Sequence, residues 1–239
     1  MKRLLFLHGN PLDGREFDGF LPELQARDYY PIIHKRPQKG IKLEPLLQSI
    51  SATAKVSGGS PFGLVAYSWG AYLALAYLKR FPENLTEVLL INPLVVSKAP
   101  VSRRSLILMS FPLLGRISLK MRRVKNCQKY IHEIFSPLQP SKPAVETLES
   151  LLTNGQVWKC CAKYKALMQK NPLTVDFKKA TVPVKVLFGE CDRAAPPQDQ
   201  LQLLRYLPKL DVETIPGASH ALPWTHGGRV MENIIEVFG

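Results

Sequence analysis

The chain has 239 residues, of which 46% are hydrophobic, and it contains no internal repeat or low-complexity tract. This size and composition exclude a disordered chain and are typical of one large globular domain, or of a core domain that carries an insert. No apolar run approaches the roughly 20 residues that a membrane-spanning helix needs. The short apolar run near the N-terminus is also below the roughly 7–15 residues of a signal-peptide core, so we expect a buried strand there.

The four cysteines show neither a CxxC pair nor a Cys/His spacing typical of a metal site (Cys127, Cys160, Cys161 and Cys191). At this chain length a disulfide framework is not expected, so a reducing compartment is favoured and we predict a cytoplasmic protein. The net charge is +13, and it is unevenly distributed. Between residues 94 and 142 there are ten Lys or Arg and one acid, a net +9, which leaves about +4 for the rest of the chain.

Short apolar runs bounded by turn residues recur along the chain and predict strands buried on both faces. They cover residues 2–8, 29–35, 61–67, 87–92, 184–188 and 211–215. Patterns with helical spacing lie between or after them, at residues 17–27, 43–55, 72–80, 199–207 and 229–238. This alternation predicts the α/β class, with a mostly parallel six-stranded sheet and helices on both faces.

The alternation stops after the fourth predicted strand. From about residue 94 to residue 172 no strand pattern occurs, and apolar residues recur at steps of three and four. We predict a helical cap, or lid, at residues 94–172, inserted into a core made of residues 1–93 and 173–239.

The sequence Ala66-Tyr-Ser-Trp-Gly70 lies between a predicted strand and a predicted helix. Ser68 on its own could be an ordinary helix N-cap. A nucleophile elbow, however, needs small residues two positions before and two positions after the nucleophile, and Ala66 and Gly70 meet that need. Alanine in place of the first glycine of G-x-S-x-G is a mild departure that keeps the site small.

A serine nucleophile also needs a base and an acid that orients the base, in the chain order Ser, acid, His. Asp192 and His220 each follow the end of a predicted strand, where open parallel sheets place their sites. Glu190 and His226 are the fallback acid and base, and Cys191 is interpreted as a packing residue. The backbone N–H groups of Trp69 and Asn10 are the predicted oxyanion hole.

These motifs, in this order over nearly the whole chain, resemble α/β-hydrolase-fold proteins with an internal helical cap. The resemblance implies that His8 supports the oxyanion loop and is not the base. The His8-Gly-Asn-Pro sequence and the Trp after the nucleophile are also similar to the haloalkane dehalogenase branch. That branch uses an Asp nucleophile, so Ser68 argues against dehalogenation. Some relatives carry the acid after the strand before the cap, where this chain has Asn92, and this favours Asp192.

The sequence therefore predicts a serine hydrolase that cleaves a small-molecule carboxylic ester or thioester through an acyl-enzyme, with no metal ion or organic cofactor. An acyltransferase using the same residues remains open, as does a non-catalytic ligand-binding or membrane-peripheral protein on the same scaffold. The basic charge of the predicted cap favours attraction to an anionic membrane surface or to the acidic head of a substrate. The simpler interpretation, a solvated helix face, stays open. Nucleic-acid binding is not expected, because the segment is poor in aromatic residues.

Overall fold

The computed structural model describes residues 1–37, 41–59, 61–96, 127–152, 155–177 and 180–239. Its centre is a six-stranded sheet in the order β2-β1-β3-β4-β5-β6, in which every neighbouring pair is parallel. The strands are β1 (Lys2–Leu7), β2 (Tyr29–His34), β3 (Phe62–Tyr67), β4 (Leu85–Ile91), β5 (Val184–Gly189) and β6 (Leu210–Ile215). The predicted fold class is confirmed, and each strand lies within two residues of its predicted bounds.

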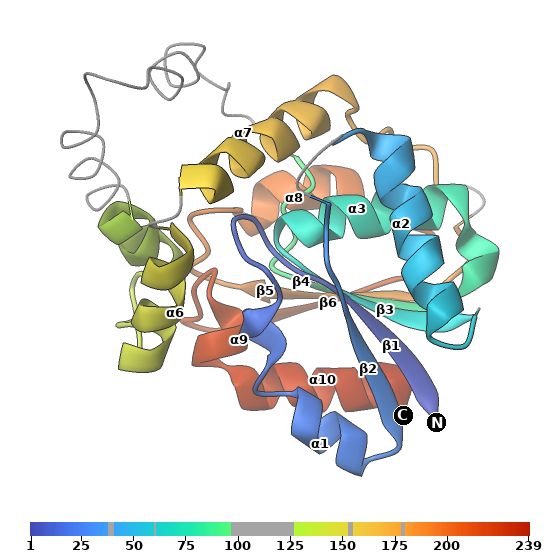
Figure 1. Ribbon diagram of the computed structural model, residues 1–239, viewed down its shortest axis with the longest axis horizontal. Coiled ribbons are helices and arrows are strands. Elements are labelled where there is room, and N and C mark those ends of the chain that lie inside the picture. The colour runs from blue at the N-terminus through green and yellow to red at the C-terminus, as the bar shows by residue number, and fades with distance from the viewer. Residues whose placement is uncertain (38–40, 60, 97–126, 153–154, 178–179) are drawn as a thin grey trace.

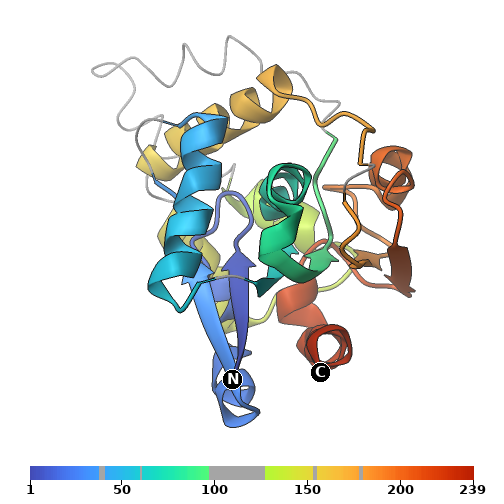
Figure 2. The same cartoon turned by 90° about the vertical axis from the view of Figure 1, so that its right-hand side faces the viewer.

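Helices cover both faces of the sheet (Figures 1 and 2). One face is covered by α2 (Leu43–Val56), α3 (Trp69–Arg80) and α8 (Pro197–Leu204), and the other by α1 (Leu21–Ala26) and α10 (Gly227–Phe238). Strand side chains alternate between the two cores: Leu5 and Leu7 pack towards α2 and α3, whereas Leu4 and Phe6 pack towards α1 and α10. Burial on both faces explains why these strands are continuous apolar runs.

The first predicted helix differs from the prediction in form. Residues 17–27 were expected to be one helix, but the structure has a short 3-10 helix, η1 (Arg15–Phe17), followed by α1. Pro22 lies in the first turn of α1, where its fixed φ favours a helix start and its missing N–H is not needed. Two further short elements, η2 (Pro82–Asn84) and α9 (Leu222–Thr225), were not predicted.

The described residues between β4 and β5 are helical at 127–135, in α6 (Lys142–Leu152) and in α7 (Gly155–Lys170). Their buried side chains join the two cores of the sheet, α7 through residues such as Tyr164 and α6 through residues such as Leu148. Residues 97–126, which hold most of the basic side chains of the predicted cap, lie outside the described residues. That residues 94–172 form a separate cap stays a prediction. No helix in the described ranges is both long and apolar enough to cross a membrane.

Candidate active site

Ser68 lies on a sharp turn between β3, which ends at Tyr67, and α3, which begins at Trp69. Its backbone has φ 53° and ψ −122°, a region that residues with a side chain rarely adopt. The turn leaves no room beside it: a Cβ atom on Gly70 would lie 2.2 Å from the carbonyl oxygen of Leu7. Gly70 therefore lets the first turn of α3 pack against the end of β1, as the elbow motif requires.

Ser68, His220 and Asp192 form one hydrogen-bonded chain. The Nε2 atom of His220 lies 2.9 Å from Oγ of Ser68, and its Nδ1 atom lies 2.6 Å from Oδ2 of Asp192. The other carboxylate oxygen of Asp192 accepts the N–H groups of Ala194 and Ala195, at 2.9 and 2.8 Å. The structure thus brings together the three residues singled out in the sequence. With Nδ1–H donated to the carboxylate, Nε2 is left to accept the serine proton.

The loops that carry Asp192 and His220 touch each other closely. A Cβ atom on Gly189, at the end of β5, would lie 2.4 Å from the carbonyl oxygen of Ser219. The N–H of Cys191 also donates to the carbonyl of Ala218, at 2.8 Å. These contacts hold the loop of Asp192 against the loop of His220.

Asn92 connects the same two loops from the end of β4. Its fully buried side chain donates from Nδ2 to the carbonyl oxygens of Ser219 and His220, at 2.9 and 2.8 Å. Its Oδ1 atom accepts the N–H of Gly189, at 2.7 Å. The sequence marked Asn92 only as a residue that cannot be the acid. The structure shows that it joins the loops of Asp192 and His220.

The predicted oxyanion donors lie on neighbouring segments, because α3 packs against the end of β1. Trp69 is the first residue of α3, so its N–H has no carbonyl partner one turn earlier in the helix. The loop of Asn10 is held by the buried carboxyl group of Glu16, which accepts the N–H groups of Gly9 at 2.8 Å and Gly14 at 3.0 Å. Burial raises the pKa of Glu16 to about 7, although these hydrogen bonds act to lower it. Sequence reasoning missed Glu16, which carries no motif.

His8 lies beside this loop and contacts neither Ser68 nor Asp192 in the described contacts. Its Nδ1 atom is 2.9 Å from the carbonyl oxygen of Gly9, and Nε of Arg36 donates to its Nε2 atom at 3.2 Å. Burial and the Arg36 charge lower the pKa of His8 well below its usual value, so the imidazole is neutral and can accept this bond. This arrangement fits a supporting role for His8.

The fallback residues make other contacts. Glu190 is exposed and accepts the N–H of Gly217 at 2.9 Å, and His226 contacts the hydroxyl of Thr225 at 2.9 Å. Cys191 is a half-buried free thiol. Across the residues with described positions, no group of three or more His, Cys, Asp or Glu side chains is arranged to hold a metal ion.

Residues that follow β4 in the chain cover the site. The hydroxyl of Tyr130 donates to the carbonyl of Asn10 at 3.3 Å, the side chain of Asn10 donates to the carbonyl of Cys161 at 3.4 Å, and the N–H of Ala221 donates to the carbonyl of Ile134 at 3.0 Å. Accordingly, Ser68 is only 4% exposed.

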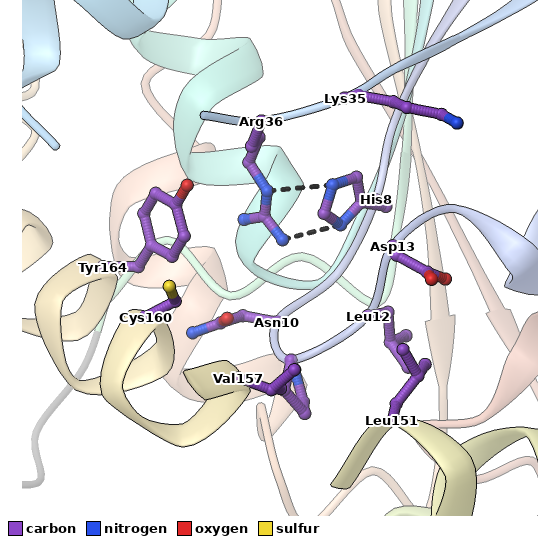
Figure 3. Close-up of a pocket in the computed structure, with 11 residues that line it drawn as sticks. His8, Asn10, Leu12, Asp13, Lys35, Arg36, Leu151, Val157, Cys160 and Tyr164 are labelled. Carbon is purple, nitrogen blue, oxygen red and sulfur yellow. Dashed lines mark hydrogen bonds between the residues drawn. The ribbon is translucent and has the colours of Figure 1, made fainter. Parts of the chain in front are cut away.

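A pocket of about 340 Å³ opens beside Asn10 (Figure 3). It is lined by His8, Asn10, Pro11, Leu12, Asp13, Lys35, Arg36, Leu151, Val157, Cys160 and Tyr164. The ring of Trp69 does not line this pocket. It is buried and packs on Tyr164, with ring centroids 4.8 Å apart.

A comparison with sequence profiles of protein families matched residues 4–232 to the alpha/beta hydrolase family. The chain belongs to this family. A comparison with curated protein sequences gave no significant match.

Solved structures with the same fold are numerous. A thermophilic esterase from Thermogutta terrifontis is 20% identical, with a TM-score of 0.78 over 99% of this chain and 89% of the esterase. A bacterial membrane phospholipase A is 19% identical, with a TM-score of 0.76 over 98% and 77%. An esterase from Exiguobacterium antarcticum is 14% identical, with a TM-score of 0.77 over 99% and 91%. At these identities the similarity concerns the fold.

Proposed function

We propose that this alpha/beta hydrolase is a serine hydrolase that cleaves a carboxylic ester or thioester, with Ser68 as nucleophile, His220 as base and Asp192 as the acid that orients the base. The observation that carries the proposal is the chain of two short hydrogen bonds from Asp192 through His220 to Ser68. Ester cleavage is also the reaction named for several proteins that share the fold, which include two esterases and a phospholipase A.

In the proposed reaction, Oγ of Ser68 attacks the substrate carbonyl while Nε2 of His220 takes its proton. The carboxylate of Asp192 stabilises the imidazolium, and the N–H groups of Asn10 and Trp69 donate to the oxyanion, each being worth on the order of 3 kcal/mol. His220 then protonates the leaving alcohol or thiol. Water, deprotonated by the same histidine, releases the acid from the acyl-enzyme. These steps require neither a metal ion nor an organic cofactor.

The first test is hydrolysis of p-nitrophenyl esters from acetate to palmitate by the wild type and by Ser68→Ala. We expect activity that peaks at one chain length and falls by on the order of 10⁴-fold or more in the variant. Ser57→Ala, at the far end of α2, is the matched control and should keep full activity.

Labelling with a fluorophosphonate tests the nucleophile without knowledge of the substrate. We expect the wild type and Ser57→Ala to be labelled and Ser68→Ala to remain unlabelled. A folded wild type that hydrolyses none of the esters and takes no label would favour a non-catalytic ligand-binding protein instead.

For its place of action, we propose the cytoplasm, with attachment to anionic membrane surfaces through the basic segment of residues 94–142. The charge of that segment, net +9, supports this part of the proposal.

A further inference from the structure

Arg36 is a largely buried cation that has no hydrogen bond to a carboxylate among the described residues. It follows β2, and its guanidinium packs against the rings of Trp69 and Tyr164, 4.8 and 4.7 Å from their centroids. Its described hydrogen bonds go to neutral groups, the carbonyl of Gly9 and the imidazole of His8. No ion pair among the described residues includes Arg36, and its Nη1 atom is buried with no hydrogen-bond partner.

The surroundings leave this charge only partly compensated. Burial lowers the pKa of Arg36 to about 10, so the guanidinium is still charged at neutral pH. The carboxyl group of Glu16 acts electrostatically on Arg36, but its oxygens already accept two backbone N–H groups and burial raises its pKa to about 7. Aromatic faces stabilise a cation but less than a carboxylate does at hydrogen-bond distance. A buried donor without an acceptor is costly, so the site favours binding an anion.

Arg36 lines the pocket beside Asn10, and the rest of the lining suits an anionic ligand with an apolar body (Figure 3). Lys35 also lines the pocket, although its ammonium group points away from Arg36 (Figure 3). Asp13 is the acidic residue among those that line the pocket, and its carboxylate already forms an ion pair with Arg15 at 3.1 Å. The remaining wall is largely apolar and includes Leu12, Leu151 and Val157.

We propose that this pocket is a carboxylate subsite and that the substrate is an ester or thioester that also carries a carboxylate, which Arg36 binds. The reaction at the other end of the substrate rests on the function proposed above. Asn10 links the two ends, because it lines the pocket and its N–H is the predicted oxyanion donor. Since Nη1 is buried, binding requires the side chains packed on the guanidinium to move, among them the ring of Tyr164 on α7.

The kinetic test compares monoethyl esters of the dicarboxylic acids from glutaric to suberic with ethyl esters of monocarboxylic acids of equal chain length. Ethanoyl and butanoyl esters of glycolic acid place the carboxylate on the alcohol side and are assayed in the same way. For at least one position of the carboxylate, we expect kcat/KM to be about 10- to 100-fold higher than for the neutral ester.

The preference should disappear in Arg36→Met, which removes the charge and keeps a linear side chain, and should largely return in Arg36→Lys. The ratio of the two substrates is the readout, because Arg36→Met also loses a bond to the oxyanion loop and lowers both rates. Arg205→Met is the matched control: Arg205 also lies on an aromatic ring, 5.1 Å from the centroid of Tyr206, but is exposed. It should leave the ratio unchanged.

A binding measurement separates this proposal from the proposed function. Adipate is titrated calorimetrically into Ser68→Ala and into Ser68→Ala combined with Arg36→Met, and we expect binding only by the first. Adipate binding that needs Arg36, in a protein that hydrolyses no ester, would support the subsite and overturn the hydrolase. Ser68-dependent hydrolysis with no preference for either carboxylate position and no adipate binding would overturn the subsite and leave the hydrolase in place.

Discussion

Replacing Asn92 by aspartate changes a single group in the side chain that joins the loops of Asp192 and His220. In the wild type, Nδ2 donates to two carbonyl oxygens, those of Ser219 and His220, and Oδ1 accepts the N–H of Gly189. In Asn92→Asp the bond from Gly189 can remain. The new oxygen, however, faces two carbonyl oxygens at hydrogen-bond distance and has no proton to offer when ionised.

The cost follows from burial and from the contacts that remain. The side chain is 0% exposed, so water cannot replace the lost donor. The carbonyl of His220 keeps the hydroxyl of Tyr67, at 3.0 Å, whereas the carbonyl of Ser219 has no other described donor. One unsatisfied carbonyl and one desolvated charge facing oxygens together amount to about 3–5 kcal/mol of unfolding free energy. Protonation restores one donor, so the pKa of the new carboxyl group should lie above its usual value.

The sign of the pH dependence then follows. A carboxyl group whose folded-state pKa is raised stabilises the fold below its unfolded pKa, and this stabilisation is lost as the pH rises through the folded pKa. The gap in unfolding free energy between wild type and Asn92→Asp should therefore be small near pH 4.5 and widen by about 2–3 kcal/mol by pH 8. Urea unfolding at both pH values measures it. Asn84→Asp, a half-buried amide bonded to the hydroxyl of Tyr77, is the control that should show no such widening. An equal gap at both pH values would refute the reasoning.

Three further predictions concern other parts of the molecule. Gly70→Ala puts a Cβ 2.2 Å from the carbonyl oxygen of Leu7. We therefore expect urea unfolding to show that the free energy of unfolding falls by about 3 kcal/mol, and we expect ester hydrolysis to stop. Gly228→Ala, whose Cβ meets no atom within 4 Å, is the control and should change neither. Burial lowers the pKa of His34 to about 4 from 6.5, so its stabilisation is present above pH 6.5 and lost as the pH falls towards 4. His34→Gln should reduce the fall in unfolding free energy between pH 7.5 and 4.5 by about 2.5 kcal/mol. For the basic segment, we expect cosedimentation with anionic vesicles at low salt and release at high salt, and equal partition onto neutral vesicles would contradict it.

The sequence was sufficient for the sheet and for the chain order of the candidate triad, for identifiable physical reasons. Strands that are covered on both faces must be apolar throughout, so continuous apolar runs in the sequence mark their positions. In a parallel sheet the carboxyl ends of neighbouring strands share one edge. Residues that directly follow strands, such as Ser68, Asp192 and His220, are therefore brought near one another by any sheet with this topology.

The supporting residues could not be found in this way, because their partners arrive through tertiary contacts. Glu16 and Asn92 are single polar residues without a periodic pattern, and their roles depend on which backbone groups the loops bring within reach. The glycines offered a partial signal. Gly70 and Gly189 stand where a Cβ would collide with another segment, so each marks a close approach, but the sequence does not say which segment approaches.

Arg36 shows the same limit for charge. In the sequence it stands in a short basic stretch after a strand, which is typical of a solvated turn. In the structure α7, distant in the sequence, brings Tyr164 against the guanidinium, which also packs on the ring of Trp69. A count of charges therefore treats Arg36 as one more contribution to the net positive charge. Its burial is what distinguishes it and supports the proposed role in binding a carboxylate. The attraction proposed for the basic segment of residues 94–142 should weaken with salt, whereas the proposed binding of one ligand group by the desolvated guanidinium of Arg36 should be screened far less. Salt dependence should consequently separate the two: vesicle binding should fall with ionic strength while the preference for carboxylate-bearing esters persists.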